Sequence, residues 1–244
     1  DSGREETKSS ESPEYSVVVP VYNSEASLEE LCDRIVGVFR ELHETYEIIL
    51  VDDSSIDTSW KVMEELHAKD PSIKIIQLTK NFGQHNAVIC GFQHASGTYV
   101  ITMDDDLQNP PEEIPKLIEE IKKGYDAVIG APDAKQDTLL KKIGSSLMTY
   151  LNSRIFSTPN HIKLSSFKIM TNAVAGGISV LKTPYPFISG MLFSVTRNIT
   201  NVTVRHEPRR YNHSNYTLSK LFKLAFNLII NYTSLPLRFL SAIG

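Results

Sequence analysis

Between residues 15 and 130 the sequence alternates between short apolar runs and stretches with helical periodicity. The apolar runs are rich in Val and Ile and do not alternate strictly with polar residues, which is typical of strands covered on both faces. We expect strands at 16–21, 47–51, 73–78, 99–103 and 127–129. This order predicts an α/β fold, a Rossmann-like and mainly parallel sheet flanked by helices, with ligands at the carboxyl ends of the strands.

The starts of three helices can be read directly. Ser27 and Glu30 have the spacing of a capping box, in which the two side chains satisfy the first backbone N–H groups. Asp57 precedes an amphipathic stretch as a candidate N-cap. Asn109 followed by Pro110 gives a cap and a first helical residue. These signals place helices directly after the first, second and fourth strands.

The pattern changes after Gly130. We expect a helix over 139–156, a shorter helix over 173–181 and a strand at 202–205. A last helix over 218–232 is amphipathic, and its apolar stripe is wider than a small core requires. The C-terminal part is therefore predicted to be an amphipathic helical region.

Charge is divided unevenly along the chain. Residues 134–244 contain 14 Lys and Arg but two acids, a net +12, whereas the first 133 residues carry −16 of an overall −4. The acidic half suits cation binding, and the basic half suits phosphates or an anionic membrane surface. Two solvated faces of opposite charge would give the same pattern.

Targeting and redox signals are sparse. No apolar run reaches the ~18 residues that cross a bilayer, and the polar N-terminus lacks the apolar stretch of a signal peptide. Cys32 and Cys90 both lie in helical patterns, which indicates buried thiols rather than a disulfide framework. We expect a cytoplasmic protein without a nucleic-acid partner.

Three adjacent carboxylates, Asp104, Asp105 and Asp106, directly follow the fourth expected strand. Their mutual repulsion at a strand end would be relieved by a divalent cation, and hard oxygen ligands suit Mg²⁺ or Mn²⁺. Such a cation can also hold a diphosphate and offset the charge of a departing one. The alternative is an acidic surface turn that caps the next helix.

Three other strand ends carry polar or aromatic residues. Pro20-Val21-Tyr22-Asn23 ends the first strand, and Asp52-Asp53-Ser54-Ser55 ends the second. A tyrosine ring can stack on a base, and a carboxylate can accept hydrogen bonds from uracil or ribose. After the third strand, the segment 81–86 opens a helix, where its backbone N–H groups would suit phosphates unless it is an ordinary loop.

Together these segments resemble glycosyltransferase family 2, which has the GT-A fold. The likeness covers roughly Tyr15 to Gly244. The segment Asp104–Glu113 is similar to the polyprenyl-phosphate branch of that family, which includes dolichol-phosphate mannose synthase and undecaprenyl-phosphate aminoarabinose transferase. Residues 209–216 and 236–238 also match that branch. The resemblance implies a nucleotide-sugar donor and divides the chain into a disordered leader (1–14), a nucleotide-sugar-binding core (15–133) and an acceptor-binding, membrane-proximal region (134–244).

Residue roles are carried over position by position. The resemblance implies that Tyr22 and Asp53 hold the base or ribose. It places Asp104 and Asp106, with Gln108, around the metal and the diphosphate. The remaining expected site residues are Pro20, Asp52, Gly83, Gln84 and Asp105 for the nucleotide, and Arg209 and Ser214 beside the diphosphate or the acceptor phosphate.

The chain departs from the family pattern where an arginine pair is expected soon after Gly130, because Asp133 and Lys135 stand there instead, and at three single positions. Ser24 stands where a glutamate is common, Asn212 replaces a glycine, and Ser189 stands where close bacterial relatives often have an aspartate. Asn212 can still adopt a positive φ.

The sequence thus predicts a metal-dependent hexosyl- or pentosyltransferase that uses a nucleoside diphosphate sugar with uridine as the preferred base. We expect a polyprenyl-phosphate acceptor, already ionised near neutral pH, at the cytoplasmic membrane face. One rival is a soluble transferase to a saccharide hydroxyl in cell-surface polysaccharide synthesis, which would need a carboxylate base. Another is a degenerate nucleotide-binding module without turnover. Whether the chain forms a homo-oligomer is left open.

Overall fold

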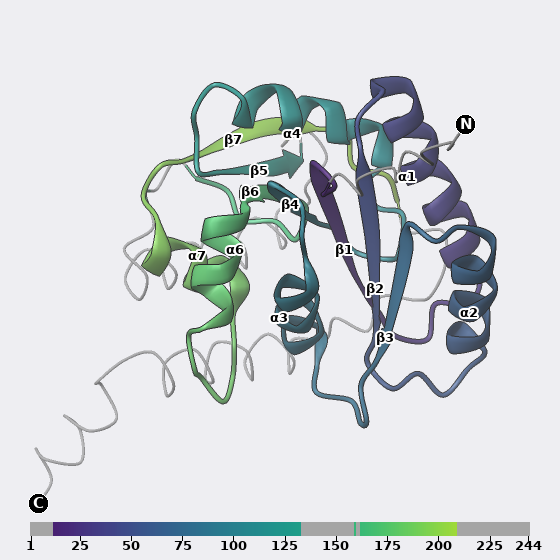
Figure 1. Ribbon diagram of the computed structural model, residues 1–244. Coiled ribbons are helices and arrows are strands. Elements are labelled where there is room, and N and C mark those ends of the chain that lie inside the picture. Colours follow the sequence, from purple (N-terminus) through teal and green to yellow (C-terminus); the bar gives the residue numbers. More distant parts are fainter. Residues whose placement is uncertain (1–11, 133–158, 160–161, 209–244) are drawn as a thin grey trace, which may run out of the picture.

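The computed structural model describes residues 12–132, 159 and 162–208 of the 244-residue chain. Within them, seven strands form one sheet in the order β3-β2-β1-β4-β6-β5-β7 (Figure 1). The strands are β1 (Tyr15–Val21), β2 (Tyr46–Asp52), β3 (Ile73–Gln77), β4 (Tyr99–Thr102), β5 (Ala127–Pro132), β6 (Lys168–Thr171) and β7 (Ile199–Val204). The helices are α1 (Leu28–Leu42), α2 (Ser59–Lys69), α3 (Gln84–His94), the short 3₁₀ turn η1 (Pro111–Glu113), α4 (Ile114–Ile121), α6 (Asn172–Ser179) and α7 (Ile188–Val195).

The sheet is mainly parallel, as expected. β1 pairs in parallel with β2 and β4, β2 pairs in parallel with β3, and β5 with β7. β6 is the exception, because it runs antiparallel between β4 and β5. The sheet therefore continues beyond residue 133 into the segment that follows.

Helices cover both faces of this sheet and form two cores (Figure 1). Along β1, Val17, Val19 and Val21 face the core shared with α1, α2 and α4, whereas Val18 faces the core shared with α3, α6 and α7. Strands buried on both faces have no polar side to expose, which explains their continuous apolar runs.

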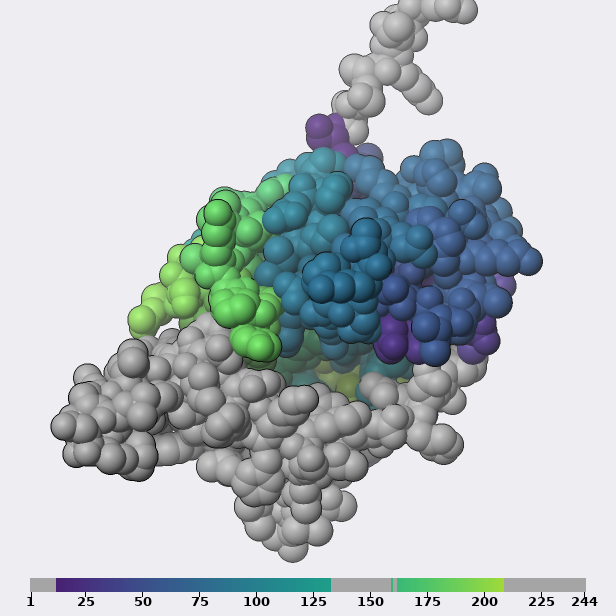
Figure 2. Space-filling view, turned by 90° about the horizontal axis from the view of Figure 1, so that it is seen from below, coloured from purple at the N-terminus to yellow at the C-terminus, as the bar shows by residue number. Residues whose placement is uncertain are grey.

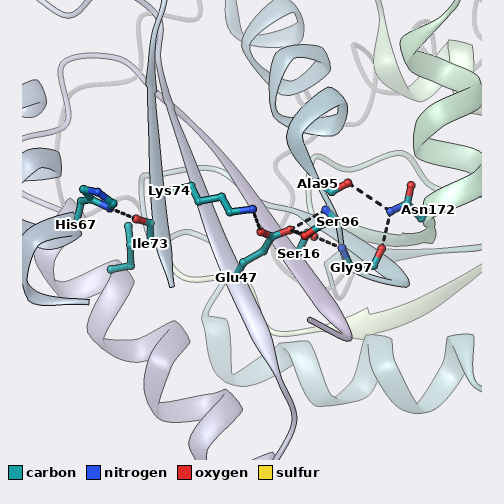
Figure 3. Close-up of polar contacts among 9 residues, drawn as sticks. All are labelled: Ser16, Glu47, His67, Ile73, Lys74, Ala95, Ser96, Gly97 and Asn172. Carbon is teal, nitrogen blue, oxygen red and sulfur yellow. Dashed lines mark hydrogen bonds and ion pairs between the residues drawn. The ribbon is translucent and has the colours of Figure 1, made fainter. Parts of the chain in front are cut away.

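A polar network closes the end of the sheet where β1 and β2 begin (Figure 3). The buried carboxylate of Glu47 accepts the Ser16 hydroxyl at 2.6 Å and the Ser96 backbone N–H at 2.7 Å, and it pairs with the Lys74 ammonium. Gly97 packs so closely on β1 that a Cβ atom would lie 2.7 Å from the Ser16 backbone nitrogen. The network therefore fixes the turn between α3 and β4 against the sheet.

All five predicted strands are confirmed to within one or two residues at their ends, except that β5 extends three residues further. The short helix expected over 173–181 is confirmed as α6, and the strand expected at 202–205 lies within and just beyond β7. β6 and α7 were not predicted. The helices expected over 139–156 and 218–232 lie outside the described residues.

The predicted capping details are partly wrong. The Ser27 hydroxyl caps nothing in α1; it donates to the Ser24 carbonyl at 3.1 Å, and the Glu30 carboxylate pairs with Arg34 instead. Asp57 does accept the first helical N–H of α2, that of Ser59, at 3.0 Å. Asn109 caps no helix, because the chain first forms the η1 turn with Pro111 at its start.

Both cysteines are free: Cys32 is buried in α1, and Cys90 is partly buried in α3. In the described part of the chain, no helix has the length and apolar character required to span a membrane.

Candidate active site

The loops that leave β1 to β4 meet at one end of the sheet and enclose a hollow of about 400 Å³. Figure 2 faces this end of the sheet, where α3 packs beside α6. The hollow is lined by Pro20, Val21, Tyr22, Ser24, Ser27, Asp53, Asn81, Gly83, Gln84, Asp104, Asp105 and Asp106. The three strand-end clusters that the sequence singled out, together with the loop after β3, therefore share one cavity.

Each of these four loops contains one residue with a positive φ. The values are 53° at Asn23, 61° at Ser54, 91° at Gly83 and 59° at Leu107. Only glycine adopts this region without steric cost, and the side chain of Leu107 is buried as well. Strained backbone of this kind clusters at ligand sites, where the surrounding structure holds it in place.

Asp105 joins the end of β4 to the loop after β1. Its carboxylate accepts the Ser24 hydroxyl at 2.5 Å and the Tyr22 backbone N–H at 3.2 Å. Burial, reinforced by the neighbouring charges of Asp104 and Asp106, raises the pKa of Asp105 to about 6 despite these hydrogen bonds. The side chain thus fixes the position of the Tyr22 loop.

Asp104 also lines the hollow. It accepts the Gln84 side-chain amide at 2.5 Å and the Ser166 hydroxyl at 2.5 Å. Burial and the charge of Asp106 raise the pKa of Asp104, while Ser166, Lys168 and Gln84 oppose that rise. A cation bound beside Asp104 would stabilise its ionised form.

Asp53 is 2% exposed, and both of its carboxylate oxygens accept backbone N–H groups. These come from Phe82 at 2.7 Å and Gly83 at 2.8 Å, so Asp53 ties the loop after β3 to the end of β2. Asp52 is fully buried and does not line the hollow; it accepts the Ser55 N–H at 3.0 Å and the Gln77 amide at 3.2 Å.

Asp106 and Gln108 form the turn that leaves the site. The Asp106 carboxylate accepts the Gln108 backbone N–H at 3.0 Å. The Gln108 side chain approaches the His206 ring at 3.4 Å, and its carbonyl accepts the Glu207 N–H at 2.8 Å. The segment after β7 is thereby held against the Asp cluster.

The predicted residues Pro20, Tyr22, Asp53, Gly83, Gln84, Asp104, Asp105 and Asp106 are brought together in the hollow. Arg209 and Ser214 lie outside the described residues. No local pattern in the sequence identifies Ser24 as a partner of Asp105. None identifies Ser166 either, which reaches Asp104 across 62 residues of chain.

A family model described as "Glycosyl transferase family 2" matches residues 16–180. The chain is 37% identical over 235 residues to an undecaprenyl-phosphate 4-deoxy-4-formamido-L-arabinose transferase of Pseudomonas fluorescens (strain Pf0-1), covering 94% of this chain and 68% of that protein. It is 36% identical over 231 residues to the protein of the same name from Yersinia pestis (strain Pestoides F), covering 94% and 70%.

Among solved structures, the chain is similar to glucosyl-3-phosphoglycerate synthase from Mycobacterium tuberculosis in complex with Mn²⁺, uridine diphosphate and phosphoglyceric acid. The TM-score is 0.65 at 18% identity, over 90% of this chain and 77% of that one. S. aureus TarS 1–349 matches with a TM-score of 0.55 at 21% identity, over 90% and 66%. These two likenesses show the fold.

Proposed function

The chain belongs to glycosyl transferase family 2, and from this premise we propose that it transfers a sugar from uridine diphosphate to a polyprenyl phosphate. The observation that carries the proposal is the hollow in which Tyr22, Asp53 and the Asp104–Asp106 cluster meet at the carboxyl end of a parallel sheet. The acceptor class follows the names of the two transferases that share more than a third of its residues.

The donor nucleotide would occupy the part of the hollow near β1 and β2. Tyr22 lines the hollow and is 46% exposed, and its ring has no aromatic neighbour among the described residues, so it can stack on a base. Asp53 would act on the nucleotide chiefly by fixing the Phe82–Gly83 backbone beside it. The diphosphate would then point toward Asp104 and Asp106.

These two carboxylates fit a divalent cation, Mg²⁺ or Mn²⁺. No three His, Cys, Asp or Glu side chains converge on a metal position within the described residues. The protein would therefore supply Asp104 and Asp106, while donor oxygens and water complete the shell, as is usual for Mg²⁺. When bound, the cation would offset the charge of the departing diphosphate.

The transfer itself needs little proton chemistry from the chain. An oxygen of the acceptor phosphate bonds to the anomeric carbon, and the bond from that carbon to the diphosphate breaks. The electron pair leaves on the nucleoside diphosphate, and no proton moves, because the acceptor is already ionised. The residues of the site hold the two reactants in line and exclude water.

A hydroxyl acceptor would need a carboxylate base. Apart from Asp104, Asp105 and Asp106, the acid that lines the hollow among the described residues is Asp53. Both of its oxygens are occupied by backbone N–H groups. This arrangement favours a phosphate acceptor over a saccharide hydroxyl.

A polyprenyl phosphate lies in a membrane, so the site should face one. The loop between α6 and α7 exposes Val180 (74%) and Tyr185 (58%), with Lys182 between them. The basic residues of 134–244 add an attraction to anionic lipid of about 1 kcal/mol for each well-placed charge. Sedimentation with anionic vesicles should show binding that falls as salt rises; equal failure with anionic and neutral vesicles would remove this part of the proposal.

The direct test is a transfer assay with undecaprenyl phosphate in detergent, Mn²⁺ or Mg²⁺, and a panel of uridine diphosphate sugars. We expect a sugar-phosphate lipid and free uridine diphosphate in equal amounts. Transfer to a saccharide alone would identify the rival acceptor. Nucleotide binding without hydrolysis or transfer of any donor would identify a module without turnover.

A further inference from the structure

A second hollow, of about 360 Å³, lies beside the first. It is walled by the start of α3, the segment 164–166, β6 and the start of α7. The two hollows share Gln84 and Asp104, while their other lining residues differ. Asp104 therefore stands between the proposed nucleotide position and a separate space.

The floor of this second hollow contains a buried cation. Lys168, on β6, is 2% exposed, and its ammonium donates to the Ser189 hydroxyl at 3.3 Å. Within the described part of the chain it forms no ion pair, although the charge of Asp104 acts on it through space. An ammonium group has three N–H donors, and it costs free energy to bury the whole group with a single neutral hydrogen-bond partner.

Hydroxyl groups line the second hollow together with Lys168. Ser189 lies directly beside it, and Ser165 and Ser166 line the same space. The Ser165 oxygen accepts the Phe167 N–H at 3.2 Å, which leaves its own hydrogen to donate. A buried ammonium beside a hydroxyl group is suited to an oxyanion.

We propose that this second hollow binds the phosphomonoester of the acceptor, with Lys168 and Ser189 as its partners. The inference rests on the proposed function and names the residues that receive its acceptor. An oxygen that displaces a diphosphate with inversion must approach the anomeric carbon from the side opposite the leaving group. The second hollow shares Asp104 with the first but not Tyr22, so an acceptor phosphate there would not compete with the nucleotide for space.

Phosphate binding can be measured without any transfer. Calorimetry and ³¹P NMR would measure the binding of inorganic phosphate and of a short-chain prenyl phosphate. A chelator in the buffer excludes a contribution from metal ions. Lys168→Met keeps the length of the side chain but removes its charge, and Ser189→Ala removes the hydroxyl beside the ammonium. Each should weaken binding at least about tenfold, as expected on removing a charge-assisted hydrogen bond.

Two control variants sharpen this measurement. Lys163→Met removes a nearby exposed charge and should leave phosphate binding unchanged. Lys168→Arg retains the charge and should retain binding. Because Ser189→Ala replaces a residue at the start of α7 and leaves β6 intact, it keeps the test decisive if Lys168→Met fails to fold. Tighter binding of the prenyl phosphate than of inorganic phosphate would identify the lipid as the source of the phosphate.

Equal phosphate affinity in wild type, Lys168→Met and Ser189→Ala would overturn the inference. So would a loss of uridine diphosphate affinity in Lys168→Met with phosphate binding unchanged, because Lys168 would then serve only as a counter-charge to Asp104. If phosphate binding depends on Lys168 but no donor is ever transferred, the anion site stands while the proposed function fails.

Discussion

The Ser24 hydroxyl donates to the Asp105 carboxylate across 81 residues of chain, at 2.5 Å, and this bond joins the loops after β1 and β4. Both loops carry residues that line the proposed nucleotide site. A serine at position 24 therefore takes part in organising the acidic cluster.

A double-mutant cycle measures this link. Ser24→Ala and Asp105→Ala should each lower the free energy of unfolding, and their effects should fail to add by roughly 0.5–3 kcal/mol, because they remove the same hydrogen bond. Urea denaturation of the two single variants and the double variant gives the coupling. Pairing Ser24→Ala with the exposed Glu64→Ala provides an additive control. Additivity between Ser24 and Asp105 would show that the bond contributes nothing.

Asp106→Asn tests metal-dependent nucleotide binding. Uridine diphosphate with Mn²⁺ should raise the melting temperature of the wild-type protein by linkage. The variant should lose that rise yet fold normally, since an asparagine oxygen can still accept the Gln108 N–H that Asp106 accepts now. The exposed Asp33→Asn is the matched control. A full shift in Asp106→Asn would exclude this residue as a metal ligand.

Variants of Asp53 test whether this residue supports nucleotide binding by holding the loop after β3. Asp53→Ala leaves the Phe82 and Gly83 N–H groups without their acceptor, so uridine diphosphate affinity should fall by roughly 1–3 kcal/mol. Asp53→Asn should give an intermediate loss. The asparagine oxygen can accept one of the two backbone N–H groups, but its NH₂ group would face the other N–H as a second donor. Calorimetry gives the affinities. Wild-type affinity in both variants, even with reduced thermal stability, would place the nucleotide elsewhere.

The sequence predicted the parallel core well because buried strands and their end motifs leave a local signal. β1 to β5 and the Asp104–Asp106 cluster were all recognised this way. β6 was missed: it is a four-residue strand whose polar first residue, Lys168, breaks the apolar run. Its place between β4 and β5 is set by antiparallel pairing with distant residues, which periodicity cannot reveal.

The difference between local patterns and long-range contacts also explains why the capping prediction failed and why two residues near the site were not identified from the sequence. Ser27 and Glu30 have the spacing of a capping box, but each makes a different contact in the structure: Ser27 donates to the Ser24 carbonyl, and Glu30 pairs with Arg34. Ser27 turns back to Ser24, which is itself held by Asp105 and by the Ser59 hydroxyl at 2.8 Å. Ser166 and Lys168 could not be placed beside Asp104 before the register of β6 was known.

The Glu47 network at the opposite end of the sheet predicts a pH dependence of stability. Burial alone would raise the pKa of Glu47, but the Lys74 ammonium and the hydroxyl and N–H donors of Ser16 and Ser96 together lower it below its ordinary 4.5. A carboxyl group with a depressed folded-state pKa contributes stability above its unfolded-state pKa. That contribution is lost as the pH falls below 4.5 and through the lower folded-state value.

Glu47→Gln isolates this contribution. Glutamine keeps the shape of the side chain but removes the charge that faces Lys74, so the variant should be less stable than wild type by about 1–3 kcal/mol at neutral pH. The difference should shrink as the pH falls below 4.5 and through the lower folded-state pKa, below which the wild-type carboxyl is neutral in the folded protein as well. Urea denaturation at several pH values between 3 and 7 measures it, with the exposed Glu64→Gln as a control that shows neither effect. A difference that persists unchanged at the lowest pH would mean that Glu47 acts through its shape and hydrogen bonds rather than through its charge.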